Sequence, residues 1–119
     1  MNTGDHIANT FEQTAYFDDQ TLAALVKEHG APLYVYSRAA LEYFARQALG
    51  FACPYGTTVR FAVKANPYPD IMKLFDSMGL WFDASSGPEA EYVIKQGINT
   101  THVALNSQEL PPNLQQLVE

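Results

Sequence analysis

The sequence predicts an α/β fold with a parallel sheet. Between residues 59 and 118, strand-like and helix-like runs alternate three times. The connections between them are short, and glycines follow the first two helix-like runs. Such alternation is typical of right-handed βαβ units, in which each helix crosses over between two parallel strands.

The first third of the chain predicts an arm, a short helix and a strand. Residues 1–20 are polar with scattered aromatic side chains and show no clear period, so we expect an extended or irregular arm. Apolar residues within 22–26, followed by Gly30, predict a short amphipathic helix. Residues 33–36 read Leu-Tyr-Val-Tyr and predict a strand.

Regular βα units follow a helix that begins near Ser37. Ser37 is a suitable N-cap, and the apolar positions 41, 44, 45 and 48 share one face of a helix that ends at Gly50. The βα units are a strand at 59–64 with a helix at 71–78, a strand at 80–83 with a helix at 86–96, and a strand at 102–106 with a helix from 112 onward.

The chain supplies fewer strands than a complete α/β domain needs. A closed (β/α)₈ barrel takes about 250 residues, and an open doubly wound sheet has at least about five strands. A helical pattern still runs at Glu119 without a C-cap. We therefore expect a truncated domain whose uncovered sheet leads to association or partial disorder.

Composition excludes several classes of partner. Seven basic and thirteen acidic residues give a formal charge of −6, without a cluster of Lys and Arg, so nucleic acid and anionic membrane are not expected partners. A single cysteine, Cys53, fits a reducing cytoplasm. The three histidines lack metal-ligand spacing, and no apolar run approaches the 18 residues of a membrane span.

Lys64 is the first candidate for chemistry, because it stands at the carboxyl end of a largely apolar strand. A lysine in a buried position is costly unless it is paired or used, and this end of a βα unit is where catalytic groups collect. It could form an imine with a carbonyl compound if burial or cations depress the pKa of its amine. Alternatively, its long stem simply carries the charge to solvent.

Asp83 and Glu89 also allow two interpretations. Asp83 could cap the turn after its strand, and Ser86 followed three residues later by Glu89 is a capping box. Both carboxylates could instead face a site, and for Glu89 the two roles are compatible. Asn66 could fix the turn before Pro67 or belong to the site.

Three segments resemble the ornithine/diaminopimelate/arginine decarboxylase family of pyridoxal-phosphate enzymes. Residues 61–67 (Phe-Ala-Val-Lys-Ala-Asn-Pro) resemble its cofactor-lysine motif, and residues 82–89 (Phe-Asp-Ala-Ser-Ser-Gly-Pro-Glu) resemble its second block. Residues 30–37 (Gly-Ala-Pro-Leu-Tyr-Val-Tyr-Ser) resemble the segment that opens the diaminopimelate branch. Residues 67–71 lack the Gly-His-Gly turn of alanine racemases, which favours a decarboxylase.

The resemblance implies a fold and a cofactor. The expected fold is a partial (β/α)₈ TIM-type barrel of the alanine racemase-like kind, with its first three βα units at 37–119. Residues 1–36 would be an amino-terminal arm that packs with a β-rich carboxyl-terminal domain. Pyridoxal 5'-phosphate would be held by the catalytic Lys64, with Ala62, Asp83 and Glu89 as further cofactor-binding residues. A full-length enzyme would be a homodimer, and this piece alone would be inactive.

The resemblance implies that the substrate is a basic or dibasic amino acid. The segment at 30–37 favours meso-diaminopimelate, which would be decarboxylated to L-lysine. Residues 104–111 depart from the diaminopimelate enzymes, so arginine, ornithine and carboxynorspermidine stay open as substrates. A non-catalytic protein that binds pyridoxal phosphate, and an α/β domain without any cofactor, are the alternatives from other classes.

Overall fold

The computed structural model describes residues 17–118, which belong to two compact units, residues 1–44 and residues 45–119. The irregular arm expected at residues 1–20 lies outside the described residues except at its end, where helix α2 (Asp19–His29) begins. The predicted boundary between arm and barrel start, at residues 36 and 37, stays a prediction.

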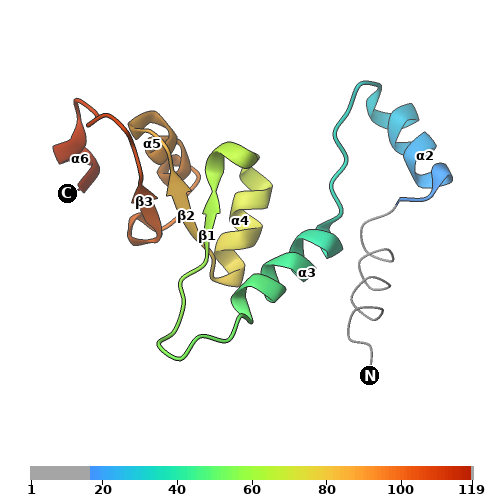
Figure 1. The fold of residues 1–119 in the computed structure, drawn as a ribbon. Helices are drawn as coiled ribbons and strands as arrows, with labels where there is room; N and C mark the ends of the chain where they lie inside the picture. The colour runs from blue at the N-terminus through green and yellow to red at the C-terminus, as the bar shows by residue number, and fades with distance from the viewer. Residues whose placement is uncertain (1–16, 119) are drawn as a thin grey trace. The chain divides into compact units, whose positions relative to one another are not determined.

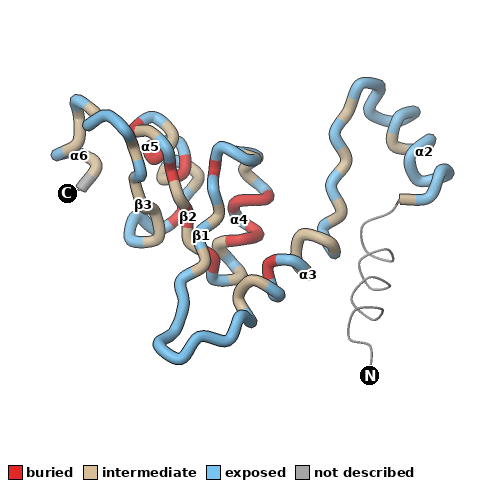
Figure 2. Tube along the Cα trace, in the orientation of Figure 1, coloured by how far each residue is buried: buried red, intermediate tan, exposed pale blue. Residues whose placement is uncertain are grey.

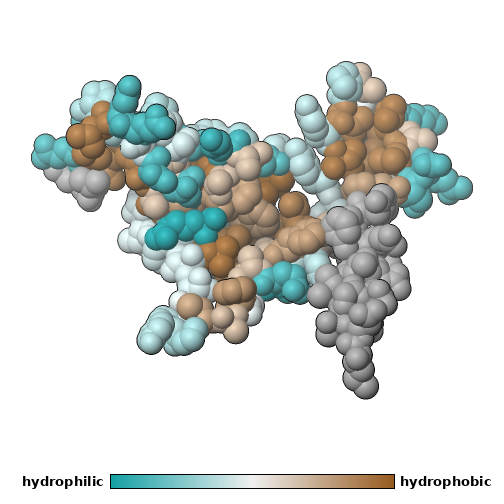
Figure 3. Space-filling model, in the orientation of Figure 1, coloured by the Kyte–Doolittle hydropathy of each residue, from teal (hydrophilic) through white to brown (hydrophobic). Residues whose placement is uncertain are grey.

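Helix α2 confirms the helix predicted before Gly30. Its N-cap is Asp18, whose side chain accepts a hydrogen bond of 2.7 Å from the backbone N–H of Thr21. This hydrogen bond lowers the pKa of the Asp18 carboxyl below its ordinary value. No residue of α2 is buried, and its apolar residues Leu22 and Val26 are exposed. Figure 3 shows hydrophobic side chains gathered over this helix.

The prediction of a strand at residues 33–36 is wrong. These residues have no regular secondary structure, and within residues 17–118 no strand pairs with them. Their alternation is nevertheless visible, since Tyr34 and Tyr36 are exposed while Leu33 and Val35 are half-buried. An alternating pattern favours an extended backbone, but a strand also requires a hydrogen-bonding neighbour.

Helix α3 (Arg38–Leu49) confirms the cap and the end that the sequence predicts. The Ser37 hydroxyl oxygen accepts a hydrogen bond from the N–H of Ala40 at 3.2 Å, and the helix ends before Gly50. Only part of the predicted apolar face is buried. Ala45 is buried, whereas Phe44 is 49% exposed and packs edge-on against Tyr43, with 5.4 Å between the ring centroids.

A three-stranded parallel sheet confirms the α/β prediction (Figure 1). The strands are β1 (Arg60–Ala62), β2 (Trp81–Ala84) and β3 (Val103–Leu105), in the spatial order β1-β2-β3. Helix α4 (Pro69–Met78) connects the first pair, and helix α5 (Gly87–Lys95) connects the second. Gly79, in the left-handed conformation at φ 93°, ends α4 as predicted.

Two strands are shorter than predicted, and short 3₁₀ turns adjoin them. The first strand ends at Ala62, and residues Val63–Ala65 form the turn η1. The third strand follows the turn η2 (Thr100–His102), and the last helix, α6 (Leu114–Val118), has five residues. Lys64 therefore lies just after β1 and not within it.

The core lies on the face of the sheet that α4 and α5 cover. Figure 2 shows most of the buried residues in β2, α4 and α5. Phe82 of β2 is fully buried, and the Phe61 ring lies edge-on to Phe75 of α4 at 4.9 Å. Each large apolar side chain buried in this way contributes about 1.5–3 kcal/mol. The packing therefore fixes α4 and α5 against β1 and β2.

The opposite face of the sheet is more open and carries polar groups. Ala62 and Asp83 are register partners on this face, at the carboxyl ends of their strands. Arg60 and Trp81 are register partners at the amino ends, with the guanidinium 5.3 Å from the indole centroid. His102 stacks on Trp81 at 5.1 Å and pairs with Asp76 at 3.3 Å. The carboxyl end of this face thus carries an acidic side chain, whereas the amino end carries aromatic and basic side chains.

Candidate functional site

A hollow of about 640 Å³ lies at the carboxyl ends of the three strands. The loops that follow β1, β2 and β3 all contribute to it. The lining residues are Ala62, Lys64, Asp83, Ser85, Asn106, Ser107, Gln108 and Glu109. Three of the four residues that the sequence predicts for cofactor binding therefore line one hollow, at the end of the sheet where parallel α/β proteins bind ligands.

Lys64 reaches this hollow from the turn η1. Val63, immediately before it, is fully buried and anchors the turn in the core, while Lys64 itself is exposed. The sequence argument that burial makes this lysine costly is therefore wrong for the described residues, because the strand ends two residues earlier. Exposure leaves the amine accessible to a molecule in the hollow.

Asp83 brings a carboxylate to the same hollow from β2. It is half-buried, and no residue within 17–118 donates a hydrogen bond to its side chain. The alternative that Asp83 caps the turn after its strand is therefore wrong in this part of the chain. Its register partner Ala62, whose side chain is a single methyl group, lines the hollow beside it.

The capping box predicted for Ser86 and Glu89 is confirmed in part, because the Glu89 carboxylate bonds to Ser85 and not to the backbone N–H of the cap residue Ser86. The Ser86 hydroxyl oxygen accepts a hydrogen bond from the N–H of Glu89 at 3.3 Å. The Glu89 carboxylate in turn accepts hydrogen bonds from the N–H of Ser85 and from the Ser85 hydroxyl, the latter at 3.0 Å. Glu89 does not line the hollow, but it holds Ser85, which does.

Several residues of the hollow were not predicted from the sequence. Ser85 follows β2 directly, and the polar residues from 106 to 109 follow β3. The sequence feature that could have identified them is that they are polar residues directly after predicted strands. Asn66 is not a lining residue; its side-chain oxygen accepts a hydrogen bond from the N–H of Tyr68 at 3.2 Å, which fits the turn-fixing interpretation.

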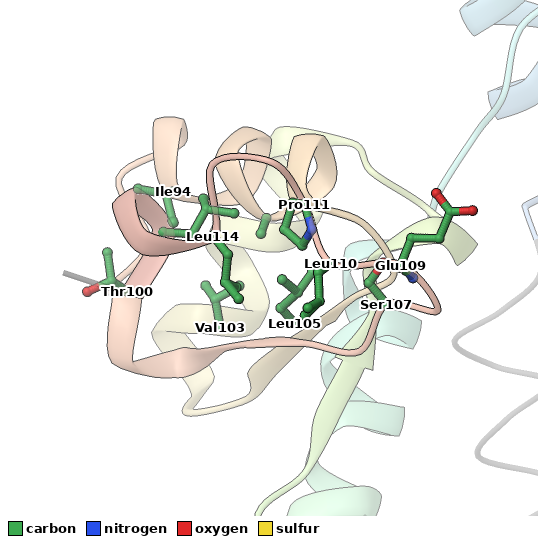
Figure 4. A pocket seen from close by; sticks show the side chains of 11 residues that line it. Ile94, Thr100, Val103, Leu105, Ser107, Glu109, Leu110, Pro111 and Leu114 are labelled. Atoms are coloured by element: carbon green, nitrogen blue, oxygen red, sulfur yellow. Dashed lines mark hydrogen bonds between the residues drawn. The ribbon is translucent and has the colours of Figure 1, made fainter.

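A second, apolar pocket of about 330 Å³ lies between α5, β3 and α6 (Figure 4). Ile94, Val103, Leu105 and Leu114 line it, together with Pro111 and others. It shares Ser107 and Glu109 with the hollow but contains none of the four predicted residues. Since aliphatic side chains dominate its wall, we place the candidate site in the hollow around Lys64.

Metal and membrane signals are absent from the described part of the chain. Within residues 17–118, no three His, Cys, Asp or Glu side chains are grouped as a metal site would require. Over the same range, no helix has both the length and the apolar character that crossing a bilayer requires.

Comparison with known proteins gives consistent matches. Residues 41–110 match the model of the pyridoxal-binding domain of pyridoxal-dependent decarboxylases. A protein of Neisseria meningitidis serogroup B, named diaminopimelate decarboxylase, is 39% identical over 85 residues, which are 71% of this chain and 20% of that protein. A protein of Haemophilus influenzae with the same name is 32% identical over 94 residues, 76% of this chain and 22% of that protein.

A Pseudomonas fluorescens protein, also named diaminopimelate decarboxylase, is 37% identical over 76 residues, 64% of this chain and 18% of that protein. This chain therefore spans about a fifth of the length of the curated relatives it matches. The matched residues 41–110 include β1, β2, β3 and the predicted site residues.

Proposed function

We infer the function of this chain from the family to which it belongs, the pyridoxal-dependent decarboxylases, through their pyridoxal-binding domain. The chain carries the lysine that holds pyridoxal phosphate in an amino-acid decarboxylase. One observation supports this most directly: Lys64, Ala62 and Asp83 line a single hollow at the carboxyl ends of the strands. On this proposal, the sheet is the start of a (β/α)₈ barrel.

The residues around the hollow fit the cofactor. Its volume of about 640 Å³ falls within the usual range for small-molecule sites, about 300–1,000 Å³. The exposed amine of Lys64 is accessible to an aldehyde, and the short side chain of Ala62 leaves room for a flat ring beside it. The carboxylate of Asp83, which accepts no hydrogen bond from residues 17–118, provides a negative charge at the same rim.

Pyridoxal phosphate, when bound, supplies the electron sink that makes loss of a carboxylate from an amino acid possible. Lys64 would hold the cofactor through its side-chain amine, and the same amine could hold a proton near the reacting carbon. Asp83 places a carboxylate at the rim of the same hollow. Glu89 acts on the site through Ser85, whose N–H and hydroxyl it holds.

The proposed substrate is meso-diaminopimelate, with L-lysine as the product. Support comes from the names of the relatives at 32–39% identity. The cofactor-binding role of Glu89 and the division into an arm at 1–36 and a barrel start at 37–119 are part of the same proposal. So are a homodimer and a cytoplasmic location for the complete enzyme, which rest on the family resemblance and on the single cysteine.

The test uses the purified protein that contains this chain. With pyridoxal phosphate, borohydride should attach the cofactor irreversibly to Lys64, as peptide mass analysis would detect. Lys64→Arg keeps the positive charge but removes the primary amine, so trapping at this position should be lost. Carbon dioxide release from meso-diaminopimelate should fall by at least about 100-fold, the lower end of what a positioned proton-transfer group contributes.

Trapping at another lysine, or full activity of the Lys64→Arg variant, would refute the assignment of Lys64. Release of carbon dioxide from arginine or ornithine in place of meso-diaminopimelate would refute the proposed substrate and leave the cofactor lysine intact. The 119-residue chain alone is expected to release no carbon dioxide from meso-diaminopimelate.

A further inference from the structure

The geometry points to Tyr92 as a residue that positions the turn carrying Lys64. This inference rests on the proposed function, because it concerns how Lys64 is presented to the cofactor. Tyr92 lies on α5 and outside the residues that line the hollow. We propose that its hydroxyl group fixes the segment after Lys64 and so sets the position of the lysine relative to Asp83.

The Tyr92 hydroxyl donates a hydrogen bond of 3.1 Å to the backbone carbonyl of Pro67. The two residues are 25 positions apart in the chain. Pro67 follows Lys64 by three residues and lies in the segment that connects η1 to α4. A side chain of α5 is therefore bonded to the backbone that leaves the lysine turn.

The turn has one firm anchor before Lys64 and little packing after it. Val63 is fully buried, but Lys64 and Ala65 are exposed. The N–H of Asn66 bonds to the carbonyl of Val63 at 3.1 Å, which closes the turn onto itself. The bond from Tyr92 then ties the following residue, Pro67, to a different element, so Lys64 is held from both sides.

Glu89 extends this arrangement to the neighbouring loop. Glu89 and Tyr92 are three residues apart, so they are neighbours on one face of α5. Glu89 holds Ser85, in the loop after β2, while Tyr92 holds Pro67, in the loop after β1. One helix face thus holds the segment that follows Lys64 and the loop that follows strand β2, on which Asp83 lies.

Loss of the Tyr92 hydroxyl should affect the site more than the stability of the fold. The Tyr92 side chain is partly exposed, so water can take over the carbonyl of Pro67 in its place. A single hydrogen bond of this kind changes the equilibrium between the bonded and the released position of the turn by a factor of between about 2 and 10. Without it, the turn samples more positions, and fewer of them present the amine correctly.

The experiment compares Tyr92→Phe with Tyr68→Phe in the purified protein, first as the apoprotein to which pyridoxal phosphate is added and then as the loaded enzyme. Tyr68 lies in the same segment, is exposed, and its hydroxyl has no hydrogen bond to residues 17–118. The measurements are the rate at which borohydride-trappable cofactor forms on Lys64, kcat and KM for the amino acid, and the urea midpoint of the apoprotein.

Tyr92→Phe should slow cofactor attachment to Lys64 and lower kcat by between about 2-fold and 10-fold, with KM nearly unchanged. Tyr68→Phe should match the unmodified protein in all measurements. A shift of the urea midpoint alone, with normal attachment rate and kcat, would mean that Tyr92 is only structural and would overturn the inference. Absence of trapping at Lys64 in the unmodified protein would instead overturn the proposed function.

Discussion

Glu89 holds the chain between β2 and α5 through two hydrogen bonds to Ser85. The same carboxylate lies in the first turn of α5, where the positive end of the helix dipole stabilises a negative charge. At the scale of single residues, the capping role is therefore structural, and the cofactor-binding role is a separate proposal. Two substitutions separate them.

Glu89→Ala should destabilise the apoprotein by about 1 kcal/mol, because the N–H and hydroxyl of Ser85 lose their acceptor. Glu89→Gln keeps an oxygen acceptor and should cost less. Urea denaturation of both variants measures the difference. If Glu89 also contacts the cofactor, Glu89→Gln should weaken pyridoxal phosphate binding more than it weakens folding. Equal small effects on both would leave capping as its whole role.

Gly87 is a second residue whose identity the packing dictates. It is buried at the first position of α5, and a Cβ placed there would lie 2.7 Å from the Cβ of Pro111 and 3.5 Å from Cδ1 of Leu117. Real Cβ atoms essentially never approach another carbon so closely. The helix start and the loop before α6 therefore approach each other too closely for any larger residue.

Gly87→Ala should lower the free energy of unfolding by about 1–3 kcal/mol, because the chain must shift to relieve the clash. Urea denaturation measures the loss. Adding Pro111→Gly removes the atoms that clash, so the double variant should recover part of the stability that Gly87→Ala loses relative to Pro111→Gly alone. Additive losses in the double variant would contradict the proposed contact.

At the scale of elements, caps decide where the helices begin. The side-chain oxygens of Ser37, Ser86 and Asp18 each accept a hydrogen bond from the backbone N–H of the third residue of the following helix. The sequence identified both serines, since a Ser before an apolar helical period is a strong local signal. Asp18 was missed, because residues 1–20 were treated as one irregular arm.

The Asp18 cap makes α2 sensitive to acid. The hydrogen bond from the N–H of Thr21 lowers the pKa of Asp18 in the folded helix below its ordinary value of 3.8. The ionised cap therefore stabilises α2 fully above pH 3.8, and this contribution is lost as the pH falls through the lowered pKa. Helix content, measured by circular dichroism, should fall in that range.

Asp18→Asn keeps a capping oxygen without a titrating carboxyl, so this part of the acid transition should disappear in that variant. Asp19→Asn, one residue later in the first helical turn, is the matched control and should retain the transition. If both variants lose it equally, general charge repulsion and not the cap would be the cause.

At the scale of the whole molecule, the second unit leaves backbone and surface uncovered. Within residues 17–118, β1 and β3 each have one edge without a neighbouring strand. Ala62 is exposed on the open face of the sheet, and Asp83 and Ala104 are only half-buried. Unpaired edges and an open face both favour association with another chain.

The 119-residue chain should therefore self-associate at micromolar concentration. Light scattering after size-exclusion chromatography measures the molar mass. Ala104→Lys places a charge on edge strand β3, on the open face, and should reduce the associated fraction. Gln96→Lys, at the C-cap of α5, adds the same charge outside the strands and should leave association unchanged. A monomer that unfolds cooperatively would contradict the prediction.

Much of the fold followed from local patterns. The parallel order of β1, β2 and β3, and the helix ends at Gly30, Gly50 and Gly79, were predicted because periodicity and glycine stops depend on neighbouring residues. The prediction of a strand at residues 33–36 was wrong, because the alternation of exposed and half-buried residues is a local property, whereas strand pairing requires a neighbour that is distant in the chain. Phe44, on the apolar face predicted for its helix, is 49% exposed, because a helical period does not specify how far each residue of that face is buried.

The sequence by itself determined the α/β order, the motif around Lys64 and the capping box of Glu89, because each is written in residues close together in the chain. Only the tertiary structure decided that Lys64 is exposed in a turn after its strand and that Asp83 lies at the same hollow. It alone brought the Tyr92 hydroxyl to Pro67. Contacts between residues far apart in the chain depend on how helices pack against the sheet, and no local pattern encodes that geometry.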